Sequence, residues 1–206
     1  MLTVIRNSIF AGICIAISAY AYVCTSLVTD PLFGAIIFSM ALTYICTREY
    51  DLYTGKIGNL MPIIRDISYG EKYKRDFIFN LVIMVIANVI TAYTIGFVFG
   101  FINPSAELYC INLFNDKLIL GYPVIFLESA FCGIVLYLAI KCYSKIGVIA
   151  LLMGVVTFIV CGFEHSIANA AYLGISTQFD IHTLAIILIS ILGNTVGSLI
   201  VSRFDI

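Results

Sequence analysis

Residues 146–175 read IGVIALLMGVVTFIVCGFEHSIANAAYLGI, an apolar run with Glu164 and His165 in its interior. A charged side chain at the centre of a bilayer costs about 2.5–3.5 kcal/mol on the insertion scale, so such a group belongs against protein or a water-filled cavity. Irregular backbone at membrane depth has the same requirement. We therefore expect a membrane segment that breaks near Glu164 and lies inside the protein.

The composition of the whole chain also indicates an integral membrane protein. Of 206 residues, 62% are hydrophobic and 11% are charged, and the mean hydropathy is +1.07. A soluble domain carries roughly 25% charged residues. The net charge of −1 argues against a nucleic-acid-binding protein. The seven cysteines show no metal-ligand spacing, so we expect no metal, no cofactor and no disulfide framework.

Six apolar runs are long enough to cross about 30 Å of hydrocarbon. We expect spans at Ser8–Val28, Leu32–Tyr53, Phe77–Phe101, Ile119–Ile140, Ile146–Gly162 (with a further apolar stretch to Ile175) and Thr183–Val201. Nine of the eleven lysines and arginines fall at the termini or in connections on one face. The positive-inside rule then predicts a cell-membrane protein with both termini cytoplasmic, with Lys117 in a loop on the opposite face.

The six spans form two sets of three with matching residues. Ser8-Ile9-Phe10-Ala11-Gly12-Ile13 is similar to Ser129-Ala130-Phe131-Cys132-Gly133-Ile134. Two further matches, 34–38 with 154–158 and 87–92 with 193–198, follow in the same order. Because three is odd, the second unit enters the membrane upside down, which is a transport architecture. We predict one membrane domain, 1–206, with repeat 1 at about 1–102 and repeat 2 at about 118–206.

The second span of the first repeat also runs into residues that do not suit a lipid-facing helix, Arg48-Glu49-Tyr50-Asp51-Leu52-Tyr53-Thr54-Gly55-Lys56. One alternative is that Arg48, Glu49 and Asp51 simply lie at a cytoplasmic helix end. Since Phe38 and Thr54 would lie on opposite sides of a straight helix, we expect the chain to be redirected, with Thr54-Gly55 in a loop.

These residues resemble the formate/nitrite transporter family. Gly162-Phe163-Glu164-His165-Ser166-Ile167-Ala168-Asn169 is similar to that family's span-5 signature. Phe38-Ser39-Met40-Ala41-Leu42, followed by Asp51-Leu52-Tyr53-Thr54, is similar to its span-2 pattern. The resemblance covers nearly the whole chain. It implies an all-helical, aquaporin-like fold with two broken helices, a homopentamer, and one path for an anion or weak acid through each protomer.

The resemblance also implies roles for individual residues. Thr54, His165 and Asn169 match residues of the substrate path, with the histidine between two constrictions. Phe38, Leu42, Leu52 and Tyr53 resemble one constriction, and Phe158 resembles the other. Lys117 is the candidate for the family's vestibule lysine, which would attract anions. The chain departs from the family pattern at Lys56 and Tyr137, where asparagines are common, and at Arg48 and Glu49, where small or apolar residues are usual.

Small monovalent anions of weak acids, such as formate, nitrite, acetate, lactate or hydrosulfide, would fit such a path. Protonating the anion removes most of its desolvation cost, and a histidine, with an ordinary pKa of about 6.5, can relay a proton near neutral pH. We expect structural roles for the other polar residues. Glu164 would anchor the broken segment, and Asn88 and Asn194 would join helices.

Three alternatives differ from an anion channel: a membrane-embedded enzyme that uses Glu164 and His165 as acid and base, a structural assembly protein, and a channel for another solute. The sequence lacks an HExxH motif and a second cluster of His, Asp or Ser. We therefore expect no enzyme activity.

Overall fold

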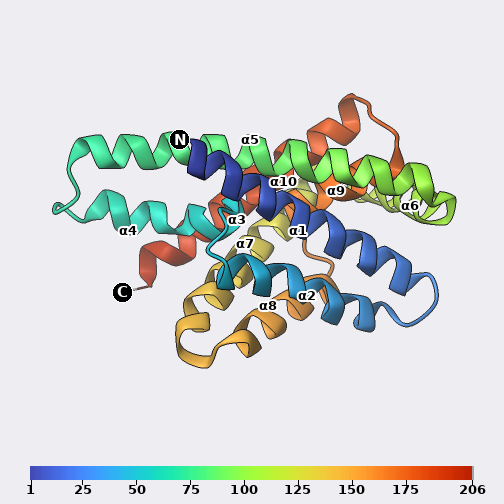
Figure 1. Cartoon of the computed structure of the whole chain (residues 1–206), viewed down its shortest axis with the longest axis horizontal. Helices are drawn as coiled ribbons and strands as arrows, with labels where there is room; N and C mark the ends of the chain where they lie inside the picture. The colour runs from blue at the N-terminus through green and yellow to red at the C-terminus, as the bar shows by residue number, and fades with distance from the viewer. Residues whose placement is uncertain (206) are drawn as a thin grey trace.

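The computed structural model describes residues 1–205 and is a bundle of helices (Figure 1). Four helices are long and apolar enough to cross a membrane, namely α1 (Leu2–Ser26), α5 (Glu71–Ile102), α7 (Tyr122–Ile146) and α10 (Ile181–Phe204). Two further apolar helices, α2 (Pro31–Thr47) and α8 (Val148–Val160), have 17 and 13 residues. The second and fifth expected spans are therefore shorter than the other four.

Each short apolar helix is followed by a break and then by a second helix inside the protein. After α2, residues 48–52 are non-helical and lead into α3 (Tyr53–Lys56), a 3-10 turn (Ile57–Asn59) and α4 (Leu60–Arg65). After α8, residues 161–165 are non-helical and lead into α9 (Ser166–Ser176), every residue of which is buried. We call α3 and α9 the re-entrant helices. The expectation of a loop at Thr54-Gly55 was wrong, because both residues belong to α3.

The segment between the third and fourth spans is a helix, α6 (Pro104–Leu120), and not the connection that we expected. The Asn103 side chain accepts a hydrogen bond from the Ala106 N–H at 3.2 Å, and Pro104 occupies the first helical position. Both are common features of a helix start. Lys117 thus lies in the last turn of a helix and is buried, which corrects its assignment to a loop.

The helices pack as two similar sets. In the first, α1 packs against α2 and α5, and in the second, α7 packs against α8 and α10. The approach within a set is close. A Cβ atom on Gly197 would lie 1.8 Å from the carbonyl oxygen of Ala130, so α10 and α7 meet at backbone contact. Helix α9 crosses to the other set and packs against α5.

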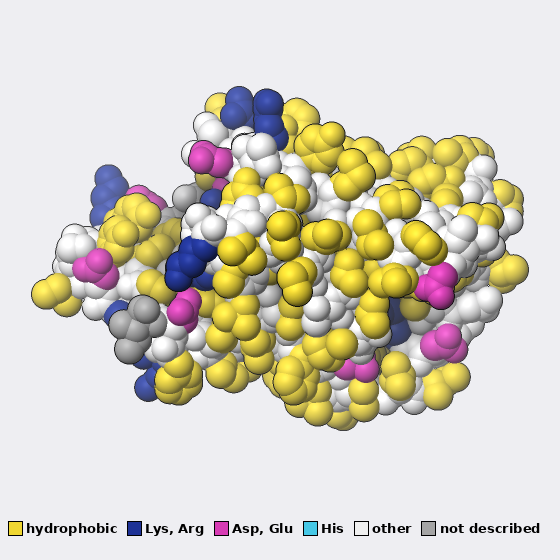
Figure 2. Space-filling view, turned by 90° about the horizontal axis from the view of Figure 1, so that it is seen from below, with side chains coloured by type: hydrophobic (Ala, Val, Ile, Leu, Met, Phe, Trp, Pro, Cys, Tyr) yellow, Lys and Arg dark blue, Asp and Glu magenta, His cyan; other side chains and the backbone are white. Residues whose placement is uncertain are grey.

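The surface of the bundle suits contact with lipid. Hydrophobic side chains cover most of the face in Figure 2, and most lysine and arginine side chains on it lie toward the left. Ile90, Leu192 and Phe131 are 60%, 58% and 52% exposed. Extended exposed apolar surface of this kind indicates a membrane-facing protein. The α4 segment and the N-terminus lie at one end of the molecule, and α6 lies at the other (Figure 1).

A buried asparagine of α5 holds the first break. The Asn88 side-chain oxygen accepts a hydrogen bond from the Tyr53 N–H at 2.8 Å. Its amide nitrogen donates to the carbonyl oxygens of Ser8 and Asp51 at 2.8 and 3.1 Å. Asn88 therefore joins the first helix of its set, the break and the re-entrant helix α3.

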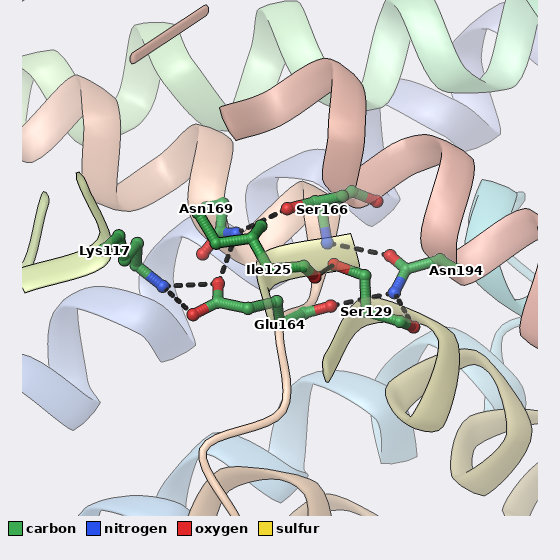
Figure 3. A network of polar contacts seen from close by, with 8 residues as sticks. Lys117, Ile125, Ser129, Glu164, Ser166, Asn169 and Asn194 are labelled. Carbon is green, nitrogen blue, oxygen red and sulfur yellow. Dashed lines mark hydrogen bonds and ion pairs between the residues drawn. The ribbon is translucent and has the colours of Figure 1, made fainter. Parts of the chain in front are cut away.

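Asn194 of α10 holds the second break in the same way (Figure 3). Its oxygen accepts from the Ser166 N–H at 2.9 Å, and its nitrogen donates to the carbonyl oxygens of Ser129 and Glu164, both at 2.8 Å. Backbone groups at membrane depth must be paired inside the protein. These two asparagines, the clamp asparagines below, supply that pairing at both breaks.

We expect Asn194→Ala to lower the thermal stability of the detergent-solubilised protein. The substitution leaves one backbone N–H and two carbonyl oxygens without their partner, and each unpaired buried group costs about 1–3 kcal/mol. The measurement is the midpoint of thermal unfolding. The matched control is Asn115→Ala, because Asn115 is exposed on α6. Equal midpoints for the two variants would contradict the clamp.

Candidate functional site

His165 lies at the break before α9 and is hydrogen-bonded through both ring nitrogens. Its Nδ1 accepts from the Ala168 N–H at 3.1 Å and so caps the helix, and its Nε2 lies 2.9 Å from the Thr54 Oγ1. His165 and Thr54 are 4% and 1% exposed. Because Nδ1 acts as an acceptor, the proton of the neutral ring is on Nε2 and is donated to Thr54. The hydroxyl hydrogen of Thr54 is then free for another acceptor.

Aromatic and aliphatic side chains surround this pair. The Phe38 and Phe158 rings meet edge to face at 6.2 Å, and Phe158 stacks on the His165 ring at 5.7 Å. Leu42, one turn further along α2, and Leu52, just before α3, are also buried. Phe38 thus contacts Phe158, although the resemblance grouped it with Leu42 and Leu52.

Tyr53 lies away from these side chains. Its hydroxyl is 2.7 Å from the Thr195 Oγ1, and its ring packs with Ile57, Leu81 and Met84. It therefore anchors α3 against α5 and α10.

Two cavities approach the site from opposite ends. The α6-side cavity, of about 110 Å³, reaches Phe38, Phe158 and His165 and is also lined by Lys117, Glu164 and Asn169. The α3-side cavity, of about 530 Å³, reaches Leu42 and Leu52 and is also lined by Asp51 and Lys56. Of the described residues, none lines both cavities. Thr54 lines neither cavity, and its hydrogen bond to His165 joins it to the wall of the α6-side cavity.

A buried ion pair lies at the α6 side of the site (Figure 3). The Lys117 ammonium donates to both carboxylate oxygens of Glu164, and both side chains are 7% exposed. The Asn169 amide donates to Glu164 Oε2 at 2.6 Å and to Ser190 Oγ at 3.0 Å. Glu164 is in the non-helical break, and its carboxylate is directed to Lys117 and Asn169. The charge of Lys117 is thereby neutralised where it lies.

A model of the formate/nitrite transporter family matches residues 1–204. The chain belongs to this family. Two solved structures share the fold. One, described as an FNT family ion channel, is 20% identical, with 98% of this chain and 88% of that chain covered and a TM-score of 0.83. The other, a pentameric formate channel with formate bound, is 19% identical, with 96% and 92% covered and a TM-score of 0.76. None of the curated protein sequences matches the chain.

As a formate/nitrite transporter, the chain is a multi-pass membrane protein of a channel and transporter family. Within residues 1–205, no group of three or more His, Cys, Asp or Glu side chains is arranged to hold a metal ion. The Glu164 carboxylate is bonded to Lys117 and Asn169, whereas an acid–base pair with His165 would need it to bond the His165 ring.

The residues that depart from the family pattern lie in different parts of the structure. Arg48 ends α2, which supports the alternative that it marks a helix end. The Tyr137 hydroxyl donates to Asp205 at 2.9 Å, and its ring lies over Gly58. Glu49 and Lys56 both line the α3-side cavity, and Lys56 is the one that belongs to the re-entrant helix α3.

The site also contains Tyr22, Tyr172 and Ser190, which were not predicted from the sequence. The two tyrosines line the α6-side cavity with ring centroids 6.2 Å apart, and Ser190 holds Asn169. A tyrosine inside a membrane span is a usable signal, because its hydroxyl needs a polar partner. Ser190 gives no comparable signal, since serines are common in packed membrane helices.

We expect Glu164→Gln to destabilise the protein by about 3–5 kcal/mol, because it leaves the Lys117 charge buried without a counter-ion. The double variant Lys117→Met with Glu164→Gln should regain much of that loss. Unfolding midpoints of both variants and of Lys117→Met complete a double-mutant cycle. Strictly additive losses would contradict a buried ion pair.

Proposed function

We propose that each chain conducts small monovalent anions of weak acids, of the formate, nitrite and hydrosulfide class, across a membrane. The observation that carries this proposal is the Thr54–His165 hydrogen bond between two cavities that end at apolar side chains. The solved neighbour with formate bound supports the substrate class. The free Thr54 hydroxyl hydrogen replaces a hydrogen bond that the anion leaves in water, and Asn169, whose two amide hydrogens are donated to Glu164 and Ser190, shapes the path beside it.

The apolar closure determines which solutes pass. A bare anion at Phe38, Phe158 and Leu42 loses its hydration without a compensating charge, which costs several kcal/mol or more. The protonated acid avoids most of this cost. Weak-acid anions therefore cross, whereas anions of strong acids, which stay charged, are held back.

His165 assists protonation through its two hydrogen bonds. If Nε2 passes its proton through Thr54 to the anion, Nδ1 must take up a proton from water in the α6-side cavity, which His165 lines, for the ring to stay neutral. A protonated Nδ1 no longer accepts from the Ala168 N–H, so this relay opens the cap of α9. Proton transfer is thus coupled to a local change at the start of a re-entrant helix.

The proposal includes the surroundings of the chain. The positive charges at the α3 end support an orientation with that end, and both termini, in the cytoplasm of a cell-membrane protein. A homopentamer is supported by the pentameric solved neighbour. Each protomer contains its own two cavities and its own Thr54–His165 pair.

We expect His165→Asn and His165→Phe to abolish or flatten the pH dependence of formate uptake into proteoliposomes. The wild type should take up formate faster at external pH 5.5 than at pH 7.5, because the relay through His165 takes its protons from the surrounding water. The matched control is His182→Asn, since His182 is exposed. A pH profile that is unchanged in both His165 variants would contradict the relay.

A further inference from the structure

The α3-side cavity carries charged side chains that the proposed route does not use. Asp51, Lys56 and Glu49 line it beside Leu52. The Lys56 N–H donates to the Leu52 carbonyl oxygen at 3.0 Å, so Lys56 is one helical turn from the apolar closure. An anion that enters this cavity therefore meets Lys56 immediately before it loses its hydration.

The hydrogen bonds of the clamp asparagines show which residues of the two halves occupy equivalent positions. Asn88 binds the carbonyl oxygen of Asp51 and the N–H two residues later, and Asn194 does the same with Glu164. Asp51 and Glu164 are therefore equivalent positions. Five residues after each, Lys56 takes the place that Asn169 takes in the other half. At the α3 side, the re-entrant helix itself supplies the cation.

The two lysines differ in how far their charge is neutralised. Lys117 bonds both oxygens of Glu164, and its side chain is 7% exposed. The Lys56 ammonium is 4.0 Å from Asp51 Oδ1, and its side chain is 39% exposed. A loose, solvated pair of this kind contributes about 1 kcal/mol or less. An incoming anion can therefore bind Lys56 at little cost, whereas it must break a buried pair to bind Lys117.

Glu49 also faces a neighbouring cleft that bears two arginines. That cleft, of about 470 Å³, is lined by Arg6, Arg48 and Glu49. Across the cleft and the α3-side cavity together, Arg6, Arg48 and Lys56 outnumber Glu49 and Asp51. The α3 end of the route thus has a positive excess, which raises the local concentration of anions.

We propose that Lys56 is an anion-receiving residue that makes the route asymmetric, with anions binding more tightly from the α3 side than from the α6 side. This inference rests on the proposed function and adds which end recognises the substrate. Lys56, which lies outside the Thr54–His165 pair, thereby determines the affinity for the anion. The inference also assigns a structural role to Lys117, whose charge stays with Glu164.

The test compares formate uptake from each side in right-side-out and inside-out membrane vesicles, with radiolabelled formate as the probe at equal pH. Proteolysis of a C-terminal tag identifies the α3 side, because α10 ends beside α4, where Arg65 donates to the Arg203 carbonyl oxygen at 2.6 Å. The wild type should show a lower half-saturating concentration when formate is presented to the α3 side.

Lys56→Gln should raise the half-saturating concentration about fivefold from the α3 side and change it little from the α6 side. Lys56→Arg should keep the wild-type values. The control Lys145→Gln removes an exposed lysine of α7 at the same end of the molecule and should have no effect. Matching unfolding midpoints for wild type and Lys56→Gln establish that the variant is folded.

Equal half-saturating concentrations from both sides of the wild type, or an unchanged value in folded Lys56→Gln, would overturn this inference. The proposed function would still stand if the His165 variants lose their pH dependence. A lower half-saturating concentration in Lys56→Gln would also overturn it, because Lys56 would then obstruct the cavity. A wild type that transports no formate from either side would overturn both proposals.

Discussion

Everything at the centre of this molecule depends on pairing the backbone groups of two broken segments away from water. An unpaired N–H or C=O in apolar surroundings costs several kcal/mol, so a break at membrane depth exists only where a fixed partner supplies its hydrogen bonds. Asn88 and Asn194 are those partners. They fix the residue just before each re-entrant helix, which is Leu52 in one half and His165 in the other. The same backbone arrangement therefore holds an apolar side chain, Leu52, in the first half and an imidazole, His165, in the second.

The charges of the site are kept away from its narrowest part. Lys117 and Glu164 neutralise each other, and the His165 ring is neutral when it caps α9. Phe38 and Phe158, whose rings meet at the inner wall of the α6-side cavity, have no charge to offer an ion. A barrier built in this way favours a solute that sheds its own charge over one that needs a counter-ion, in agreement with the weak-acid substrates proposed above.

Much of the fold could be predicted from the sequence, because membrane spans, small-residue matches and the charged residues after Phe158 are local patterns. The α6 helix was missed, since its hydrophobic residues are mixed with Asn, Asp and Glu and it follows a long apolar run directly. The site was harder to predict. That Tyr53 bonds Thr195 rather than facing the path depends on how α3 rotates against α10. The pairing of Lys117 with Glu164 joins elements distant in sequence, and no spacing rule reports such a contact.

The clamp asparagines have a consequence for anyone who redesigns this scaffold. Each uses one acceptor and both donors of its amide on three different backbone segments. Aspartate has the same shape but would set a carboxylate oxygen against two carbonyl oxygens, and glutamine would displace the amide by a methylene. The two positions therefore have no conservative replacement. Residues that line the path can be changed to admit new solutes, whereas these two asparagines have to be retained for the fold.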